Sequence, residues 1–155
     1  MSTTTIKEPP KPSVIVMAED DLDDRLLIKD ALAESNWPAD LRFVDNGEEM
    51  MAYLTRSGKY TDAADAPRPN LILLDLNMPR KDGREVLREM KNHGDLKRIP
   101  VVVLTTSRAD TDIERTYELG ANSFISKPIE FESLVKLMRL LSQYWLQTVE
   151  LPNGK

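Results

Sequence analysis

Five short runs of aliphatic residues stand out along the chain, and longer stretches of mixed polarity separate them. Runs of this length, bounded by turn-forming residues, are typical of strands that are buried on both faces. The runs are VIVMA at 14–18, LRFV at 41–44, LILL at 71–74, VVVL at 101–104 and SFIS at 123–126. We therefore expect five buried strands.

The stretches between the runs place apolar residues three or four positions apart, which is the spacing of an amphipathic helix. The first helix should end before Trp37-Pro38, because the residue before a proline is disfavoured in the helical region. Gly94 is a candidate C-cap for the third helix, since glycine readily adopts the left-handed conformation found there. The expected helices are 23–35, 47–56, a segment containing Val86, Leu87 and Met90, 110–118, and 130–146.

Strands that alternate with helices are typical of an α/β protein with a doubly wound parallel sheet. Right-handed crossovers limit five such strands to a few topologies, and strand order 2-1-3-4-5 is a common one. In that order the first and third strands are neighbours, and ligands bind at their carboxyl ends. A chain of 155 residues suits one domain. We place it at 14–146, between a mobile tail at 1–13 and a second tail at 147–155.

Composition removes several classes of function. The chain has no cysteine and a single histidine, His93, which excludes thiolate sites and sites that need two histidines. A net charge of −5 argues against nucleic acid or an anionic membrane as partners. The N-terminus has no apolar signal region, and no stretch approaches the ~18 apolar residues of a membrane span. We therefore expect a soluble, cytoplasmic protein.

Acidic residues follow both of the strands that meet at the centre of the predicted sheet. Glu19-Asp20-Asp21 follows the first strand and Asp75 follows the third. Carboxylates gathered at one edge repel one another, and a hard divalent cation such as Mg²⁺ offsets that charge. The alternative is that these acids only form turns or cap the next helix, as Asp21, Asp23 or Asp24 would do.

The fourth and fifth strands end in groups that complement a carboxylate. Thr105-Thr106-Ser107 supplies hydroxyls, and Lys127-Pro128 supplies an ammonium within reach of Asp75. Mg²⁺ and Lys127 would balance the three negative charges of Glu19, Asp20 and Asp75. Asp75 is then the candidate nucleophile for a phosphoryl group, whose oxygens Lys127, Thr105 and Mg²⁺ would hold. Each feature alone is common in loops and helix starts, but their combination at one edge of the sheet favours a reactive site.

Four segments together resemble the receiver domain of two-component response regulators: VIVMAEDD, LILLDLNMPRKDG, PVVVLTTS and LGANSFISKP. The resemblance extends from about Val14 to Trp145. It implies a flavodoxin-like receiver fold with strand order 2-1-3-4-5, Mg²⁺ as the cofactor and a sensor histidine kinase as the partner. The chain ends soon after the receiver, so a stand-alone type is expected. Residues 57–69 and the QYWLQTVELP ending resemble stand-alone receivers paired with phytochrome-type, light-sensing histidine kinases.

The resemblance also implies roles for the residues of the acidic edge. Asp75 matches the phosphoacceptor, which also contacts the metal ion. Asp20 matches a direct Mg²⁺ ligand, and Glu19 matches a residue that acts on the metal through water. Asn77 matches the position whose backbone carbonyl completes the metal shell.

Further roles fall on the fourth and fifth strands. Thr105 matches the switch hydroxyl and Lys127 the phosphate-binding lysine, with a cis bond between Lys127 and Pro128. The chain departs from the common pattern at Phe124, where a switch tyrosine is frequent. A phenylalanine ring can still rotate, but it has no hydroxyl to bond. The alternative is that Phe124 is an ordinary core residue.

Two other positions carry expectations about local structure. In the turn after Asp75, Pro79 sets the bend, and Gly83 is expected to provide a left-handed backbone. His93 follows the third helix, away from the carboxyl ends of the strands. We expect it to place positive charge near the helix C-terminus rather than to act as a phosphoryl donor.

The last helix carries two apolar stripes, although one is enough to pack a helix on a sheet. The first stripe is Phe131, Leu134, Val135, Met138, Leu141 and Trp145, and the second is Leu137, Leu140 and Tyr144. The second stripe predicts a homodimer through the fourth helix, fifth strand and fifth helix. The alternative is one broad stripe that residues 146–151 partly cover.

Two rival functions fit the sequence less well. A phosphohydrolase of the haloacid dehalogenase type also uses an aspartate after a strand, but it needs an acid two residues further on. This chain has Asn77 there, and an amide does not perform that proton transfer. A flavin-binding module needs donors after the first strand, where this chain is acidic. The sequence therefore favours a switch that accepts a phosphoryl group over an enzyme.

Overall fold

Five parallel strands form a single sheet in the order β2-β1-β3-β4-β5. The computed structural model describes residues 13–78, 80–106 and 110–148, and all statements below concern these residues. The strands are β1 (Ser13–Ala18), β2 (Ala39–Val44), β3 (Leu71–Leu74), β4 (Val101–Thr105) and β5 (Ser123–Ser126). The predicted doubly wound α/β fold and its strand order are confirmed. β2 begins two residues earlier than expected, at Ala39 rather than Leu41.

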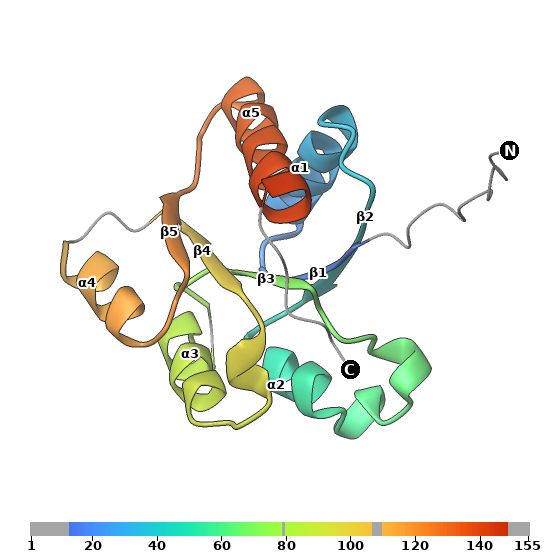
Figure 1. The fold of residues 1–155 in the computed structure, drawn as a ribbon, viewed down its shortest axis with the longest axis vertical. Coiled ribbons are helices and arrows are strands. Elements are labelled where there is room, and N and C mark those ends of the chain that lie inside the picture. Colours follow the sequence, from blue (N-terminus) through green and yellow to red (C-terminus); the bar gives the residue numbers. More distant parts are fainter. Residues whose placement is uncertain (1–12, 79, 107–109, 149–155) are drawn as a thin grey trace, which may run out of the picture.

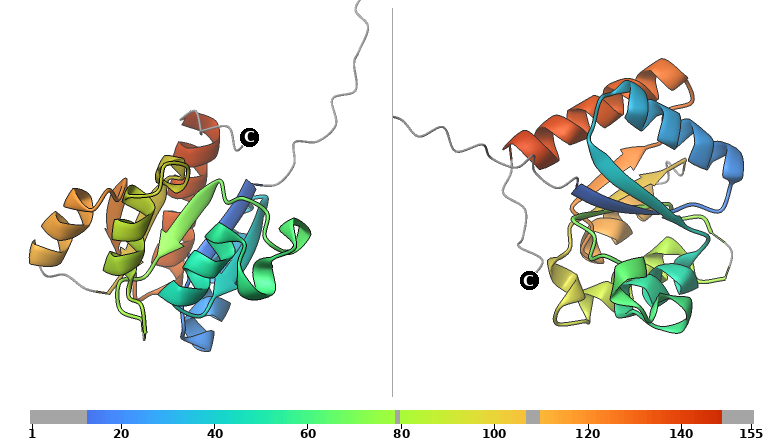
Figure 2. Two further views of the ribbon diagram at one scale, coloured as in Figure 1. Left: turned by 90° about the horizontal axis from the view of Figure 1, so that it is seen from below. Right: turned by 90° about the vertical axis from the view of Figure 1, so that its right-hand side faces the viewer.

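Helices cover both faces of the sheet. They are α1 (Leu22–Glu34), α2 (Gly47–Thr55), α3 (Gly83–Lys91), α4 (Asp110–Glu118) and α5 (Phe131–Ser142). Figure 1 shows α1 and α5 together on one face, α2 and α3 on the other, and α4 beside the β5 edge. The two side views show the same three layers (Figure 2).

The core consists of two layers, one on each face of the sheet. Alternate residues of a strand point to opposite faces. Val16 and Ile72 therefore pack toward α2 and α3, whereas Ile15 and Leu73 pack toward α1 and α5. All four are buried. This burial on both faces explains why the strands read as continuous aliphatic runs.

Two helix ends differ from the sequence expectations. α3 ends at Lys91 with Asn92 as its C-cap, and the Asn92 N–H donates to the carbonyl of Arg88. Asn92 keeps a right-handed conformation (φ −87°), so no left-handed residue is needed and Gly94 is not the cap. α5 ends at Ser142 and is followed by a π-helical turn, Gln143–Thr148, rather than continuing as an α-helix to 146.

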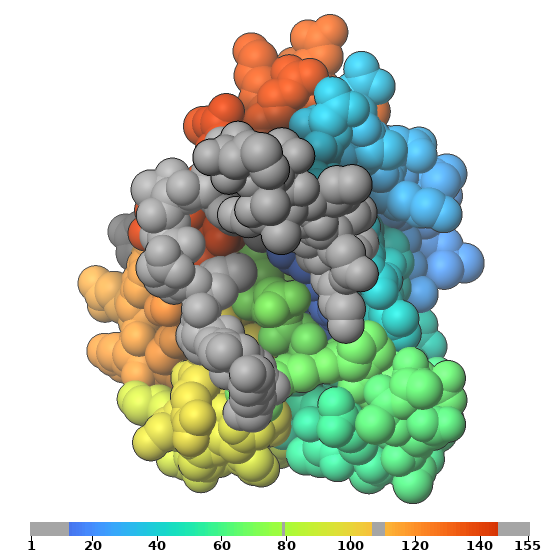
Figure 3. Space-filling model, turned by 45° about the vertical axis from the view of Figure 1, so that its right-hand side comes forward, coloured from blue at the N-terminus to red at the C-terminus, as the bar shows by residue number. Residues whose placement is uncertain are grey.

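The long connection 57–69 is held against α2 by polar contacts. It contains two 3₁₀ turns, Gly58–Tyr60 and Ala63–Asp65. Glu49 accepts hydrogen bonds from the Tyr60 hydroxyl (2.6 Å) and the Asp45 N–H (2.6 Å), and its carboxylate lies 2.7 Å from the Lys59 ammonium. In the space-filling view this segment, in green, joins α2 in one continuous surface (Figure 3).

None of the helices in the described part of the chain is both long and apolar enough to span a membrane. The predicted tails fall almost entirely outside the described residues, apart from Ser13 in β1 and residues 147–148 of the π-helical turn. The expected cytoplasmic location stays a prediction.

Candidate functional site

Asp75 lies at the centre of the acidic edge, directly after β3, and is only 7% exposed. Its Oδ1 accepts hydrogen bonds from the Thr105 hydroxyl (3.0 Å) and the Asn77 N–H (3.1 Å). Its Oδ2 accepts a hydrogen bond from the Lys127 ammonium (3.4 Å). The Asp75 N–H donates to the carbonyl of Ala18 (3.4 Å), which ties the residue to β1. The structure thus brings Asp75, Thr105 and Lys127 together as predicted.

Lys127 joins three carboxylates. Its Nζ lies 3.1 Å from Glu19 Oε1, 3.4 Å from Asp75 Oδ2 and 3.5 Å from Asp24 Oδ2. The side chain is only 9% exposed. Burial disfavours the charged amine, but the attraction of Asp75 and Glu19 outweighs it, so the pKa of Lys127 is raised. The lysine therefore stays protonated beside Asp75.

Glu19 is the most buried acid of the cluster, at 1% exposure. Burial, followed by the neighbouring carboxylates of Asp24 and Asp75, raises the pKa of Glu19 to about 8, against the opposing effect of Lys127. Within the described residues its Oε2 meets no hydrogen-bond donor. Protonation of Glu19 relieves the repulsion among these carboxylates. The cluster is therefore short of positive charge.

Asp24 is a member of the cluster that the sequence did not single out except as a possible cap. Asp21 caps α1 instead, because its Oδ1 accepts the N–H groups of Asp23 (2.8 Å) and Asp24 (3.1 Å). The cap fixes the phase of the first turn, and the Asp24 side chain then reaches Lys127. The neighbouring carboxyl group of Glu19 is the main reason that the pKa of Asp24 is lowered.

Asp20 and Asn77, two expected metal ligands, both lie exposed at this edge. No hydrogen bond or ion pair among the described residues involves the Asp20 carboxylate. Over the same residues no group of three or more His, Cys, Asp or Glu side chains is arranged to hold a metal ion. Mg²⁺ usually takes one or two carboxylates and completes its shell with water. Oxygen donors beside the unpartnered, buried Glu19 Oε2 suit a cation of this type.

The loop after Asp75 corrects the expectation for Gly83. The left-handed residue of this loop is Arg80 (φ 62°), and Gly83 does not have a positive φ. Gly83 is required for a close approach, because a Cβ there would lie 2.6 Å from the Asp75 carbonyl oxygen. Its N–H donates to the carbonyl of Leu76 (3.2 Å). The start of α3 is thereby held against the backbone of the site.

β5 places Lys127 by a backbone hydrogen bond from its N–H to the Thr105 carbonyl (2.8 Å). The described residues contain no cis peptide bond, so the expected cis bond between Lys127 and Pro128 is not found. The trans form is intrinsically preferred by about 0.5–1 kcal/mol before proline.

Phe124 is half-buried against the core, and its N–H donates to the Tyr117 hydroxyl (3.0 Å). Its role as a switch stays a prediction.

The family model of the response regulator receiver domain matches residues 15–139. The chain belongs to this family, and it is therefore a signalling protein of the response regulator class. It is 45% identical to response regulator Rcp1 of Synechocystis sp., over 91% of this chain and 94% of that protein.

Three solved structures of relatives resemble this one closely. Phosphorylated cyanobacterial phytochrome response regulator RcpA is 46% identical over 92% of this chain and 99% of that chain, with a TM-score of 0.83. The Mn²⁺-bound form of Rcp1 is 45% identical over 92% and 100% of the two chains, with a TM-score of 0.81. RPA3017 of R. palustris, in red light signalling, is 35% identical over 91% and 99%, with a TM-score of 0.87. The chain is thus homologous to phytochrome response regulators.

Proposed function

We propose that the protein accepts a phosphoryl group on Asp75 from a phytochrome-type sensor histidine kinase. The observation that carries this proposal is the setting of Asp75. Its carboxylate is held at a strand end by the Thr105 hydroxyl, the Asn77 N–H and the Lys127 ammonium. The relative RcpA, a phytochrome response regulator whose structure was solved in the phosphorylated form, supports the same assignment.

Each side chain has a separate part in the proposed reaction. Asp75 attacks phosphorus through one carboxylate oxygen while the leaving group departs from the donor. Lys127 attracts the new phosphoryl oxygens, because its protonated amine already lies beside Asp75 Oδ2. Thr105 would turn its hydroxyl, which donates to Asp75 Oδ1 in this structure, toward those oxygens. This movement, with Phe124, would couple the site to the face formed by α4, β5 and α5.

Mg²⁺ is the proposed cofactor, and the Mn²⁺-bound structure of Rcp1 supports a divalent cation in this family. Asp20, Asp75 and the Asn77 carbonyl would hold it directly, with Glu19 acting through water. When bound, the ion would offset the carboxylates and the charge that develops on the transferring group. Asp20 is exposed and unpaired among the described residues, so it is available for that role.

A histidine kinase must bring its phosphohistidine to the acidic edge, and apolar surface beside that edge supports docking there. Leu22 and Leu26 of α1 and Ile129 after β5 are exposed. Along the chain each lies two residues from Asp24 or Lys127, whose ion pair joins the start of α1 to the residue after β5. Exposed apolar residues grouped around a polar site commonly mark a protein interface.

The proposal is tested with acetyl phosphate and Mg²⁺ as a kinase-free donor system. Wild type should gain one phosphoryl group in the intact mass spectrum, and Asp75→Asn should gain none. Asp30→Asn, which changes an exposed aspartate of α1, is the matched control and should label normally. Chelation of Mg²⁺ should suppress labelling of wild type. Labelling that persists in Asp75→Asn would sink the assignment.

A further inference from the structure

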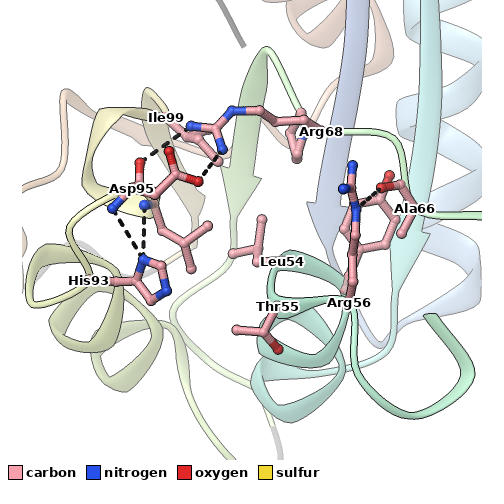
Figure 4. Close-up of a pocket in the computed structure, with 11 residues that line it drawn as sticks. Leu54, Thr55, Arg56, Ala66, Arg68, His93, Asp95 and Ile99 are labelled. Atoms are coloured by element: carbon pink, nitrogen blue, oxygen red, sulfur yellow. Dashed lines mark hydrogen bonds and ion pairs between the residues drawn. The ribbon is translucent and has the colours of Figure 1, made fainter. Parts of the chain in front are cut away.

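A cavity of about 440 Å³ lies at the amino ends of β3 and β4, opposite the edge that carries Asp75. Its walls come from the end of α2, the connection 57–69 and the segment between α3 and β4. Figure 4 shows Arg56 on one side, His93, Asp95 and Arg68 on the other, and Leu54 between them. Its volume falls within the range of about 300–1,000 Å³ that is typical of small-molecule sites.

Arg56 presents a guanidinium group at the rim of this cavity. Its Nε donates to the carbonyl of Ala66 (3.2 Å), and no other hydrogen bond or ion pair in the described part of the chain engages its terminal nitrogens. Arg56 is also the C-cap of α2, in the left-handed conformation (φ 52°, ψ 52°). Glycine is usual there, because a side chain is disfavoured in this conformation. The site thus holds a strained, available cation.

His93 supplies a second donor and corrects the expectation of a simple positive charge. Its Nδ1 accepts the N–H groups of Asp95 (3.3 Å) and Leu96 (3.2 Å). A nitrogen that accepts hydrogen bonds carries no proton, so the ring proton is on Nε2. Among the described residues Nε2 has no partner, so its N–H remains available as a donor.

The single carboxylate of the cavity is already neutralised. Arg68 Nη1 donates to Asp95 Oδ2 (2.7 Å), and Arg68 Nη2 donates to the Asp95 carbonyl (3.3 Å). The hydrogen bond from Arg68, with a smaller contribution from the charge of Arg98, lowers the pKa of Asp95. The available polar groups are therefore donors, and the local charge is positive in a chain of net charge −5.

We propose that this cavity binds a small organic anion, whose carboxylate or phosphate group is held by Arg56 and whose other end lies toward the His93 N–H across the cavity. Guanidinium and imidazole N–H groups complement such an anion, and charge-assisted hydrogen bonds are the stronger kind. The side chains of Leu54, Leu96 and Ile99 line the rest of the cavity and would contact an apolar body. The site lies at the other end of the sheet from Asp75, so it is independent of phosphoryl transfer.

The proposal is tested by backbone-amide NMR titration of the full chain with three small molecules that share a phenyl ring and differ in their charged group. Benzoate and phenyl phosphate present the two anionic groups, and benzamidinium presents the same ring with a cation. Benzoate or phenyl phosphate at millimolar concentration should shift the amides of Arg56, Ala66, His93 and Asp95, and benzamidinium should not. The anion that binds more tightly identifies the preferred group.

Variants distinguish this cavity from general attraction to arginine. Arg56→Met keeps an unbranched side chain but removes the charged guanidinium group, and it should weaken binding of the better anion at least tenfold. Arg88→Met, an exposed arginine of α3 outside the cavity, should leave binding unchanged. Equal response to benzamidinium, absence of shifts at the cavity amides, or unchanged affinity in Arg56→Met would each overturn the proposal. The wild-type comparison of probes decides the matter even if a variant fails to fold.

Discussion

Gly83 shows how one residue without a side chain shapes the site. A Cβ at this position would meet the Asp75 carbonyl oxygen at 2.6 Å and the Leu76 Cα at 3.0 Å, and both are backbone atoms that cannot move aside easily. The contact holds the first turn of α3 against the loop that carries Asp75. Backbone rather than side-chain crowding is therefore the constraint at this position.

Gly83→Ala should lower the free energy of unfolding by about 1–3 kcal/mol, the usual cost of overpacking, and slow labelling by acetyl phosphate. Gly94→Ala is the matched control, because nothing lies within 4 Å of a Cβ there. Its effect should stay within about 0.5 kcal/mol. Urea denaturation measures both variants. A Gly83→Ala protein as stable and as reactive as wild type would contradict this account of the loop.

Glu49 makes stability depend on pH. Partial burial by itself would raise its pKa, but the hydrogen bonds from Lys59, Tyr60 and the Asp45 N–H lower it from 4.5 to about 2. A depressed folded-state pKa stabilises the fold above pH 4.5, and this contribution is lost as the pH falls toward 2. Glu49 thus favours the folded state most at neutral pH.

Glu49→Gln should cost about 1–2 kcal/mol at pH 7, less than a fully buried charged hydrogen bond because Lys59 is exposed. The difference in unfolding free energy between Glu49→Gln and wild type should become smaller as the pH is lowered from 5 toward 2. Glu48→Gln is the control, since Glu48 forms only an exposed ion pair with Arg80 (3.4 Å). Urea titrations at several pH values give the comparison. A difference in unfolding free energy that does not vary with pH would refute this role of Glu49.

Some roles of single residues could be predicted from the sequence and others could not. That Asp75, Thr105 and Lys127 lie close together could be predicted, because each stands at the carboxyl end of a strand in a known topology. Asp24 was missed because its direction depends on Asp21 being the cap, which fixes the phase of α1. The expectation that Gly83 adopts a left-handed backbone is wrong. Its actual constraint, the close approach of another segment of the chain, leaves no pattern in the neighbouring sequence.

At the scale of elements, α4 is held differently from the other helices. Within its described side chains, 111–118, only Thr116 is buried. Polar contacts also attach it to α3: Arg84 donates to Asp112 from Nη2 (2.6 Å) and Nε (3.2 Å), and Lys91 donates to the Glu118 carbonyl (2.7 Å). A helix with little buried surface opens easily. α4 therefore suits an element that changes position.

A double-mutant cycle of Arg84→Met and Asp112→Asn should give a coupling free energy of about 0.5–1 kcal/mol, as for a partly exposed ion pair. Each single variant should also speed hydrogen exchange in α4 while leaving exchange in β1 and β3 unchanged. Arg88→Met, on the same helix as Arg84 but without a described ion pair, is the control. Zero coupling with unchanged exchange in α4 would show that the pair does not hold this helix.

The strands could be predicted from the sequence more fully than the long connection 57–69. The β1, β3 and β4 runs were clear because burial on both faces leaves only aliphatic residues. The path of 57–69 was not predictable, since it depends on Tyr60 meeting Glu49 and on Arg68 meeting Asp95 far along the chain. The cavity beside that segment could not be foreseen for the same reason.

At the scale of the whole molecule, the outer face of α5 supports the predicted homodimer. Leu140 is 62% exposed and Tyr144 is 51% exposed, whereas Leu137 packs partly against the core. The second apolar stripe is thus mostly uncovered by the described residues. Part of the alternative cover, residues 149–151, lies outside the described part of the chain.

Leu140→Asp should shift the protein toward the monomer in light scattering at high micromolar concentration, because it places a charge in the proposed interface. Leu26→Asp, an equally apolar surface position on α1, should leave the dimer intact. It should instead slow phosphotransfer from a histidine kinase encoded near this gene. A wild-type protein that is monomeric with and without phosphorylation would rule out the dimer.

The central claim is that Asp75 alone becomes an acyl phosphate, although Glu19, Asp20 and Asp24 lie at the same edge. Borohydride reduces an acyl phosphate to an alcohol, so reduction converts a phosphorylated aspartate to homoserine. Protein treated with acetyl phosphate and Mg²⁺ should, after reduction and peptide mass spectrometry, contain homoserine at position 75 and at no other acid. Homoserine at position 20 or 24, or none at position 75, would contradict the account.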